Sequence, residues 1–281
     1  MSFDIESIVS DSTKLFSLPT IFHKINQVVN DPETTFQDVA EVISQDVSLT
    51  ARLLKIANSS FFGFTEKVDT ITHAVSVIGS DQLRDLALGT YVIDAFKGMN
   101  QSSISMESFW KHSIAAGIAC RIIAVYKRME NPERLYIAGM LHEVGRLIIF
   151  ANFENEVEKI LESYGEEKEL LCDIEKKQFG WDHAYLGAKF LKAWNLSESQ
   201  IEAVKFHLNP LEAKTFPDET AIIHLGSVIA KILGLGNSGE KFIPKIEPKT
   251  WELLGLPMDL LPAIFQQVNS QFSETVDVFM G

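Results

Sequence analysis

The chain has little cysteine, since only Cys120 and Cys172 occur among its 281 residues. Two cysteines are too few for a disulfide framework, and these two lack the close spacing of a zinc knuckle. Because Cys120 lies in an apolar run with helical spacing, we expect it to be a small core residue. The sequence therefore predicts a fold that is held together by packing, without a disulfide.

Clusters of basic residues and long apolar runs are also absent. The formal net charge is −13, whereas binding to a phosphate backbone rests on clustered lysine and arginine, so we expect no nucleic-acid partner. The N-terminus carries Asp4 and Glu6 where a signal peptide has a basic region. The apolar runs 114–126 and 135–150 are both interrupted by charged residues. We expect a cytoplasmic protein that does not insert into a membrane.

Alternation of apolar and polar residues, which is typical of strands, is missing, and helical spacing recurs along the chain. Thr35 and Asp182 are expected to cap helices, and Ser197 with Gln200 matches a capping box. The segment 97–105, rich in glycine, asparagine and serine, is the best internal boundary. We therefore predict an all-α fold with two parts, residues 1–100 and 101–281.

The most apolar long run, residues 136–150, contains His142, Glu143 and Arg146. We expect this run to be a single buried helix, in which Gly139 and Gly145 mark the close approach of a backbone or a ligand. Two interpretations of its polar residues remain open. His142 and Glu143 are adjacent ligands of a divalent metal ion, or Glu143 pairs with Arg146 and His142 binds a buried oxygen.

Other histidines also lie at helix ends or in apolar runs. His112 is near the start of a predicted helix over 106–128. His183 lies in the first turn of its helix, where the dipole disfavours imidazolium and leaves a nitrogen lone pair free for a metal. His207 lies at a helix C-terminus, where the dipole favours the charged form, so it is either a capping histidine or a ligand.

Several separated motifs over residues 15–235 together resemble the HDOD family. In the second part of the chain they are Trp110-Lys111-His112-Ser113, the run Ala138-Gly139-Met140-Leu141-His142-Glu143-Val144-Gly145-Arg146-Leu147, and the run Phe179-Gly180-Trp181-Asp182-His183-Ala184-Tyr185-Leu186-Gly187-Ala188. In the first part they are Leu18-Pro19, Asp46-Val47-Ser48-Leu49-Thr50, Ala57-Asn58-Ser59-Ser60-Phe61-Phe62-Gly63 and Ala74-Val75-Ser76-Val77-Ile78-Gly79.

The resemblance implies a multi-helix HD-like bundle, residues 101–281, with an additional N-terminal helical subdomain, residues 1–100. The helices of 235–281 lie outside the clear resemblance. HDOD domains are relatives of the HD superfamily of metal-dependent phosphohydrolases and are regarded as signalling output modules with partly lost catalytic residues. By this resemblance the candidate metal ligands are His112, His142, Glu143, His183 and His207, and the candidate ions are divalent iron, manganese, zinc or nickel.

The sequence departs from the pattern of an active HD enzyme at four positions. Glu143 stands where the aspartate of the His-Asp pair is expected, and Ser227 stands where a late aspartate is expected. Leu208 replaces the second histidine of a His-His pair, and Arg146 replaces a lysine. With the late carboxylate and the second histidine lost, a mostly imidazole site can hold a transition metal but poorly offsets the charge of a two-metal clamp.

Two possible functions follow from the HDOD resemblance and these departures. The first is a signal-transduction output domain with a degenerate HD-type site, which acts by binding a signalling protein or a nucleotide-type small ligand. The alternative is a metal-dependent phosphohydrolase that acts on a nucleotide or a cyclic dinucleotide through a metal-bound hydroxide. The serine at position 227, in place of a carboxylate, separates the two and favours the binding domain.

Overall fold

The structure is a computed structural model that describes residues 4–99, 104–164 and 169–281. Every regular element in these ranges is a helix and none is a strand, so the predicted all-α fold is confirmed. No described helix is both long enough and apolar enough to cross a bilayer. The chain divides into a larger unit, residues 1–16 and 99–268, and a smaller unit, residues 17–98 and 269–281. The first helix therefore groups with the larger unit, and the end of the chain groups with the smaller one.

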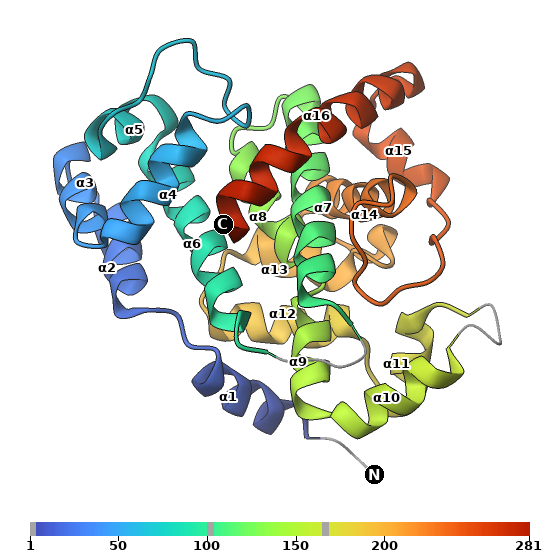
Figure 1. Ribbon diagram of the computed structural model, residues 1–281. Helices are drawn as coiled ribbons and strands as arrows, with labels where there is room; N and C mark the ends of the chain where they lie inside the picture. The colour runs from blue at the N-terminus through green and yellow to red at the C-terminus, as the bar shows by residue number, and fades with distance from the viewer. Residues whose placement is uncertain (1–3, 100–103, 165–168) are drawn as a thin grey trace. The chain divides into compact units, whose positions relative to one another are not determined.

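The smaller unit is built from five helices and the end of a sixth (Figure 1). Thr35 begins α3 with a reciprocal capping box, in which its side chain accepts from the Asp38 backbone and Asp38 returns the bond. Arg52 on α4 forms an ion pair with Asp94 on α6, 2.6 Å between Nη1 and Oδ2. The helices are α2 (Thr20–Val29), α3 (Phe36–Ser44), α4 (Val47–Ala57), α5 (Ile71–Ile78), α6 (Ser80–Phe96) and the later part of α16 (Leu261–Met280).

The larger unit is centred on α7 (Met106–Lys127), which packs against α8 (Pro132–Leu141) and α14 (Pro217–Ile232) (Figure 1). Cys120 is fully buried at this contact, as the sequence predicted. A Cβ at Gly139 would lie 2.6 Å from Cys120 Sγ and 3.0 Å from the Gly117 backbone, so only glycine allows α8 to approach α7 this closely. These three helices form the core against which the site is built.

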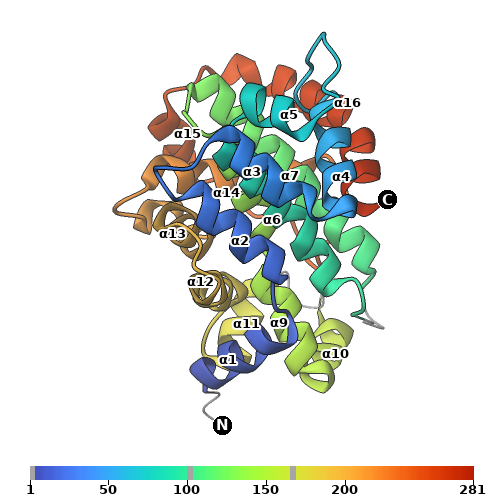
Figure 2. The same cartoon turned by 90° about the vertical axis from the view of Figure 1, so that its left-hand side faces the viewer.

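The remaining helices of the larger unit surround this core. Asp182 caps α12 through the Tyr185 amide, and Ser197 with Gln200 forms the predicted capping box of α13. The first helix, α1, packs against α12 (Figure 2). The elements are α1 (Ile5–Leu15), α9 (Val144–Asn152), α10 (Glu154–Ser163), α11 (Leu171–Phe179), α12 (His183–Ala193), α13 (Glu198–Phe206), η1 (Pro210–Glu212), α15 (Pro248–Leu254), η2 (Met258–Leu260) and the start of α16.

The single helix expected over 136–150 is wrong, because the chain turns at His142 and Glu143. His142 is the C-cap of α8, and Glu143 is the N-cap of α9 with φ −105° and ψ 12°. In a continuous helix these neighbours would point about 100° apart. The turn instead brings both side chains to the same buried space, where Glu143 Oε1 lies 3.5 Å from His142 Nε2. The interruption of the helix is therefore what assembles the site.

Candidate functional site

The five predicted ligand residues come from four different places in the larger unit, and all five are buried. One lies on α7, two form the turn between α8 and α9, one begins α12 and one ends α13. In this order the residues are His112, His142, Glu143, His183 and His207.

Three of the five bring one ligand atom each into a common group. The ligand atoms of His112, His142 and Glu143 all lie within 4.8 Å of one another, and this is the one such group of histidines, cysteines and acids among the described residues. The other two histidines extend a row of rings. The ring centroid of His207 lies 5.0 Å from that of His142 and 5.5 Å from that of His183. His183 and His207 are thus neighbours of the group without belonging to it.

Two of the imidazoles are held by backbone carbonyls behind them. Nδ1 of His142 donates to the Gly139 carbonyl at 2.5 Å, and Nδ1 of His207 donates to the Val204 carbonyl at 2.7 Å. This fixes the tautomer and leaves each Nε2 with a lone pair. Burial lowers the pKa of His142, and lowers the pKa of His207 well below its ordinary value, so both rings are neutral. At His207, burial outweighs the helix dipole that was expected to favour the charged form.

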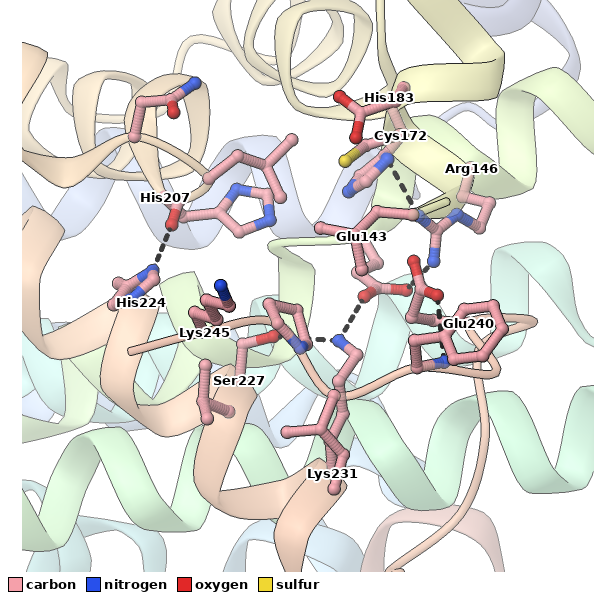
Figure 3. A pocket seen from close by; sticks show the side chains of 18 of the residues that line it. Glu143, Arg146, Cys172, His183, His207, His224, Ser227, Lys231, Glu240 and Lys245 are labelled. Atoms are coloured by element: carbon pink, nitrogen blue, oxygen red, sulfur yellow. Dashed lines mark hydrogen bonds and ion pairs between the residues drawn. The ribbon is translucent and has the colours of Figure 1, made fainter. Parts of the chain in front are cut away.

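Glu143 has both of its oxygens paired with cationic side chains. Oε2 accepts from Arg146 Nη1 at 2.7 Å, and Oε1 accepts from Lys231 Nζ at 2.9 Å (Figure 3). Burial raises the pKa of this carboxyl, but Arg146 and Lys231 outweigh it and hold the pKa well below the usual range. Glu143 is therefore ionised. The second interpretation of the sequence, without a metal, expected two contacts: Glu143 with Arg146 and His142 with a buried oxygen. Both are present.

Lys231 was not among the predicted site residues, although it reaches the centre of the group. Its ammonium lies 2.9 Å from Glu143 Oε1, 3.0 Å from Ser227 Oγ and 3.4 Å from His112 Nε2. Ser227 and Lys231 are four residues apart on α14 and therefore share one face of the helix. The serine at the position of the expected late aspartate was the available signal, because a lysine one turn further on can occupy the space that a metal ion would need.

Arg146 joins the group to a second buried acid, Glu175, which the sequence did not indicate. Arg146 Nε donates to Glu175 Oε1 at 2.9 Å, and Glu175 Oε2 accepts from His183 Nδ1 at 2.6 Å and from the His183 amide at 2.9 Å. Glu175 lies on the buried face of α11, where a carboxylate is stable only because it is fully paired.

Replacing Glu175 with glutamine is expected to lower the free energy of unfolding by about 2–3 kcal/mol near pH 7. Burial raises the pKa of Glu175, but His183 and Arg146 outweigh it and bring the pKa from 4.5 to about 2. Because the pKa is lower in the folded state, the stabilisation is present above about pH 4.5 and is lost as the pH falls towards about 2. Urea unfolding at several pH values should show the two proteins converging over this range. An unchanged difference on acidification would contradict the assignment.

The site faces a pocket with a volume of about 480 Å³, which is lined by α9, α11, α12, α14 and the segment between α14 and α15 (Figure 3). Hydrogen bonds hold that segment in place at two residues, Ser238 and Glu240. Ser238 contacts Arg146 Nη1 through its hydroxyl at 3.3 Å and its carbonyl at 3.4 Å. Glu240 accepts from the Leu171 and Phe242 amides and from the Tyr164 hydroxyl. The segment is thereby held as a wall of the pocket.

His224 also lines the pocket, but its two ring nitrogens are used by the protein. Nδ1 donates to the His207 carbonyl at 2.8 Å, and Nε2 accepts from the Glu247 amide at 3.5 Å. In contrast, Nε2 of His142 and of His183 have no hydrogen-bond partner among the described residues. Unpartnered buried nitrogens of this kind are available to a ligand in the site.

A metal ion fits the spacing of the three grouped donors but not their surroundings. Donors of a tetrahedral site with bonds of about 2.1 Å lie about 3.4 Å apart. Glu143 Oε1 lies 3.5 Å from His142 Nε2 and 3.8 Å from His112 Nε2, which is close to that requirement. However, the Lys231 ammonium lies within hydrogen-bond distance of two of these atoms, Glu143 Oε1 and His112 Nε2, and would repel a divalent cation there. With Lys231 in place, the residues do not fit a resident metal ion.

One relative of known sequence is an uncharacterized protein of Treponema pallidum (strain Nichols), which is 26% identical over 196 residues. The alignment covers 68% of this chain and 37% of the relative, so this chain spans well under half of the relative's length.

Two solved structures have a similar fold. One, from Shewanella amazonensis SB2B and named a presumed phosphohydrolase, has a TM-score of 0.74 and 22% identity, and the match covers 97% of each chain. Another, from Marinobacter aquaeolei VT8 and named a presumed signal transduction protein, has a TM-score of 0.71 and 19% identity over 96% of this chain and 61% of that one. At these identities the likeness shows the fold alone, and it confirms the predicted HD-like helical architecture.

The sequence motifs also agree with the family comparison. The HDOD domain matches residues 15–210, which is more than half of the chain and includes His112, His142, Glu143, His183 and His207. The chain belongs to the HDOD family.

Proposed function

We propose that this protein is a non-catalytic output domain of a signalling system, which acts by binding a signalling protein or a nucleotide-type small ligand. It binds through an HD-type site that has lost the charge arrangement for hydrolysis. One observation carries the proposal: both oxygens of Glu143 are paired with cationic side chains, Arg146 at 2.7 Å and Lys231 at 2.9 Å.

Glu143 matters because it is the one carboxylate among the five predicted ligand positions. Hydrolysis of a phosphodiester by an HD-type centre needs metal ions that polarise the phosphoryl oxygens and generate a hydroxide. Such ions need open coordination positions and anionic ligands. Here the carboxylate is already neutralised by the chain itself, and Ser227, at the position of the late carboxylate, is a partner of Lys231 at 3.0 Å. The side chains therefore favour binding over turnover.

The pocket supports a ligand of small-molecule size. Its volume of about 480 Å³ lies within the range of roughly 300–1,000 Å³ that is common for small-molecule sites. Its wall carries the Lys245 ammonium as a hydrogen-bond donor and the His183 Nε2 nitrogen, which has no partner in the described part of the chain. A ligand with both anionic oxygens and hydrogen-bond donors, such as a nucleotide, matches this mixture of groups.

We expect no phosphodiesterase or phosphatase turnover above background, even with manganese or iron added. Tag-free protein would be incubated with each metal and with cyclic dinucleotides, nucleoside phosphates and a generic phosphodiester. The His142→Ala and Glu143→Ala variants, checked for folding by circular dichroism, serve as matched controls. Equal rates in all three proteins would identify any residual hydrolysis as contamination.

Robust turnover by the wild-type protein that both substitutions abolish would overturn the proposal. It would instead establish the alternative, a metal-dependent phosphohydrolase that uses the His112, His142 and Glu143 group. The three donor atoms lie within 4.8 Å of one another, and this spacing supports the alternative.

A further inference from the structure

We propose that Lys231 is a built-in substitute for a metal ion, and that removing its ammonium alone turns the His112, His142 and Glu143 group into a metal-binding site. This inference rests on the proposed function in that both take the native site to work without a metal. It goes further by naming the side chain responsible and by predicting a latent site one substitution away.

The hydrogen-bond donors of the Lys231 ammonium match the acceptors around it. An ammonium carries three N–H donors. The Lys231 ammonium has three acceptors within reach: Glu143 Oε1 at 2.9 Å, Ser227 Oγ at 3.0 Å and His112 Nε2 at 3.4 Å. These acceptors come from α7, α14 and the start of α9, so one cationic group ties three separate elements together, as a metal ion does. The lysine side chain is 11% exposed, so this cation is largely shielded from solvent.

Lone pairs of three side chains converge beside the Lys231 ammonium. The Lys231 contact makes His112 Nε2 an acceptor. His142 Nε2 also carries a lone pair, because Nδ1 of that ring donates to the Gly139 carbonyl. Glu143 Oε1 lies 3.5 Å from His142 Nε2 and 3.8 Å from His112 Nε2. Three electron-rich atoms at this spacing repel one another unless a cation lies beside them. Lys231 is the side chain that supplies it.

Lys231 is also paired with Ser227 on the same helix. The HDOD resemblance puts a serine where an active enzyme has a ligating aspartate. The same face of α14 carries, one turn later, the lysine that now binds both this serine and Glu143 (Figure 3). The loss of a carboxylate and the gain of a tethered cation both make the net charge of the side chains in the site more positive. Together they replace a metal and one of its anionic ligands with a neutral hydroxyl and an ammonium.

The test uses Lys231→Met, because methionine keeps a long unbranched side chain and removes the charge. Binding of Co²⁺ and Zn²⁺ to tag-free protein would be measured by calorimetry, and bound Co²⁺ by its visible absorption. We expect Lys231→Met to bind one ion on the order of 100-fold more tightly than the wild type, since a cation at hydrogen-bond distance from the ligands no longer competes. Adding Glu143→Gln to this variant should abolish the gain.

Lys245→Met is the matched control, because it removes a lysine from the lining of the same pocket. This variant should bind Co²⁺ no better than the wild type. Thermal unfolding gives an independent measurement: Zn²⁺ should raise the melting temperature of Lys231→Met and leave that of the wild type unchanged. If the methionine variant does not fold, Lys231→Gln tests the same loss of charge.

Equal Co²⁺ affinity in the wild type and in both Lys231 variants would overturn the inference, and so would a gain that survives Glu143→Gln. Neither result depends on turnover. Hydrolysis by the wild type, in contrast, would overturn the proposed function and leave the binding comparison to be decided by the Co²⁺ data. The two proposals can therefore fail separately.

Discussion

Replacing Arg146 with methionine is expected to lower the free energy of unfolding by about 3–5 kcal/mol, because two buried carboxylates lose their shared partner. The Arg146 side chain is 1% exposed and donates to Glu143 at 2.7 Å and to Glu175 at 2.9 Å. Burial lowers the pKa of this guanidinium, but Glu143 and Glu175 outweigh it and raise the pKa, so the group stays charged. Methionine fills similar space and cannot donate to either acid.

Urea unfolding followed by tryptophan fluorescence measures this effect, since all four tryptophans lie in the larger unit, which contains the site. Lys176→Met is the control. Lys176 lines the same pocket and pairs with Asp182 at 3.1 Å, but its side chain is 44% exposed, so its loss should change the free energy of unfolding by less than about 1 kcal/mol. If both substitutions have equally small effects, the buried network does not stabilise the fold as argued.

Gly145→Ala is the second substitution with a large expected effect, about 3 kcal/mol of destabilisation. A Cβ at this position would overlap the carbonyl oxygen of His183 and would lie 2.6 Å from the Gly187 amide nitrogen. Both neighbours are backbone atoms of α12, so no side-chain rotation relieves the overlap. The helices α9 and α12 would have to separate, and this would move His183 and Glu143 relative to each other.

Chemical unfolding followed by far-ultraviolet circular dichroism reports on an all-helical chain and suits this comparison. Gly98→Ala is the matched control, because a Cβ at Gly98 would meet nothing within 4 Å. It should change the free energy of unfolding by no more than about 0.5 kcal/mol. A Gly145→Ala protein that is as stable as Gly98→Ala would mean that α9 and α12 adjust more easily than their backbone contact indicates.

The helices were predictable because their signals are local. The capping residues Thr35, Asp182 and Ser197 act within three positions of themselves, and their predicted caps are present. The helix expected over 136–150 failed for a different reason. Its apolar pattern continues through His142 and Glu143, and nothing in the local sequence breaks it. The turn follows from burying two polar side chains in one place, which is a property of the assembled unit.

Only those site residues that lie in the sequence motifs were predicted. His112, His142 and Glu143 come together as a group, and His183 and His207 lie beside them. The residues that decide the electrostatics were not found. Lys231 lies 88 positions from its partner Glu143, and Glu175 lies 29 positions from Arg146.

A lysine in the last turn of a helix and a glutamate in an amphipathic helix are both usually exposed to solvent. Lys231 and Glu175 were therefore indistinguishable from solvated charges until the fold had placed them. Position in the chain alone cannot tell a buried partner from a surface charge when the contact spans several helices.

The attachment of Lys231 to α14 has a consequence for competition in solution. A group tethered next to its acceptor has an effective concentration set by the backbone, in the millimolar range or higher for well-placed groups. A dissolved metal ion must compete with that local concentration at Glu143. Dilution does not weaken the tethered ammonium, and a chelator does not remove it. Because the ammonium is covalently attached to the chain, the occupancy of this position does not depend on the concentration of metal.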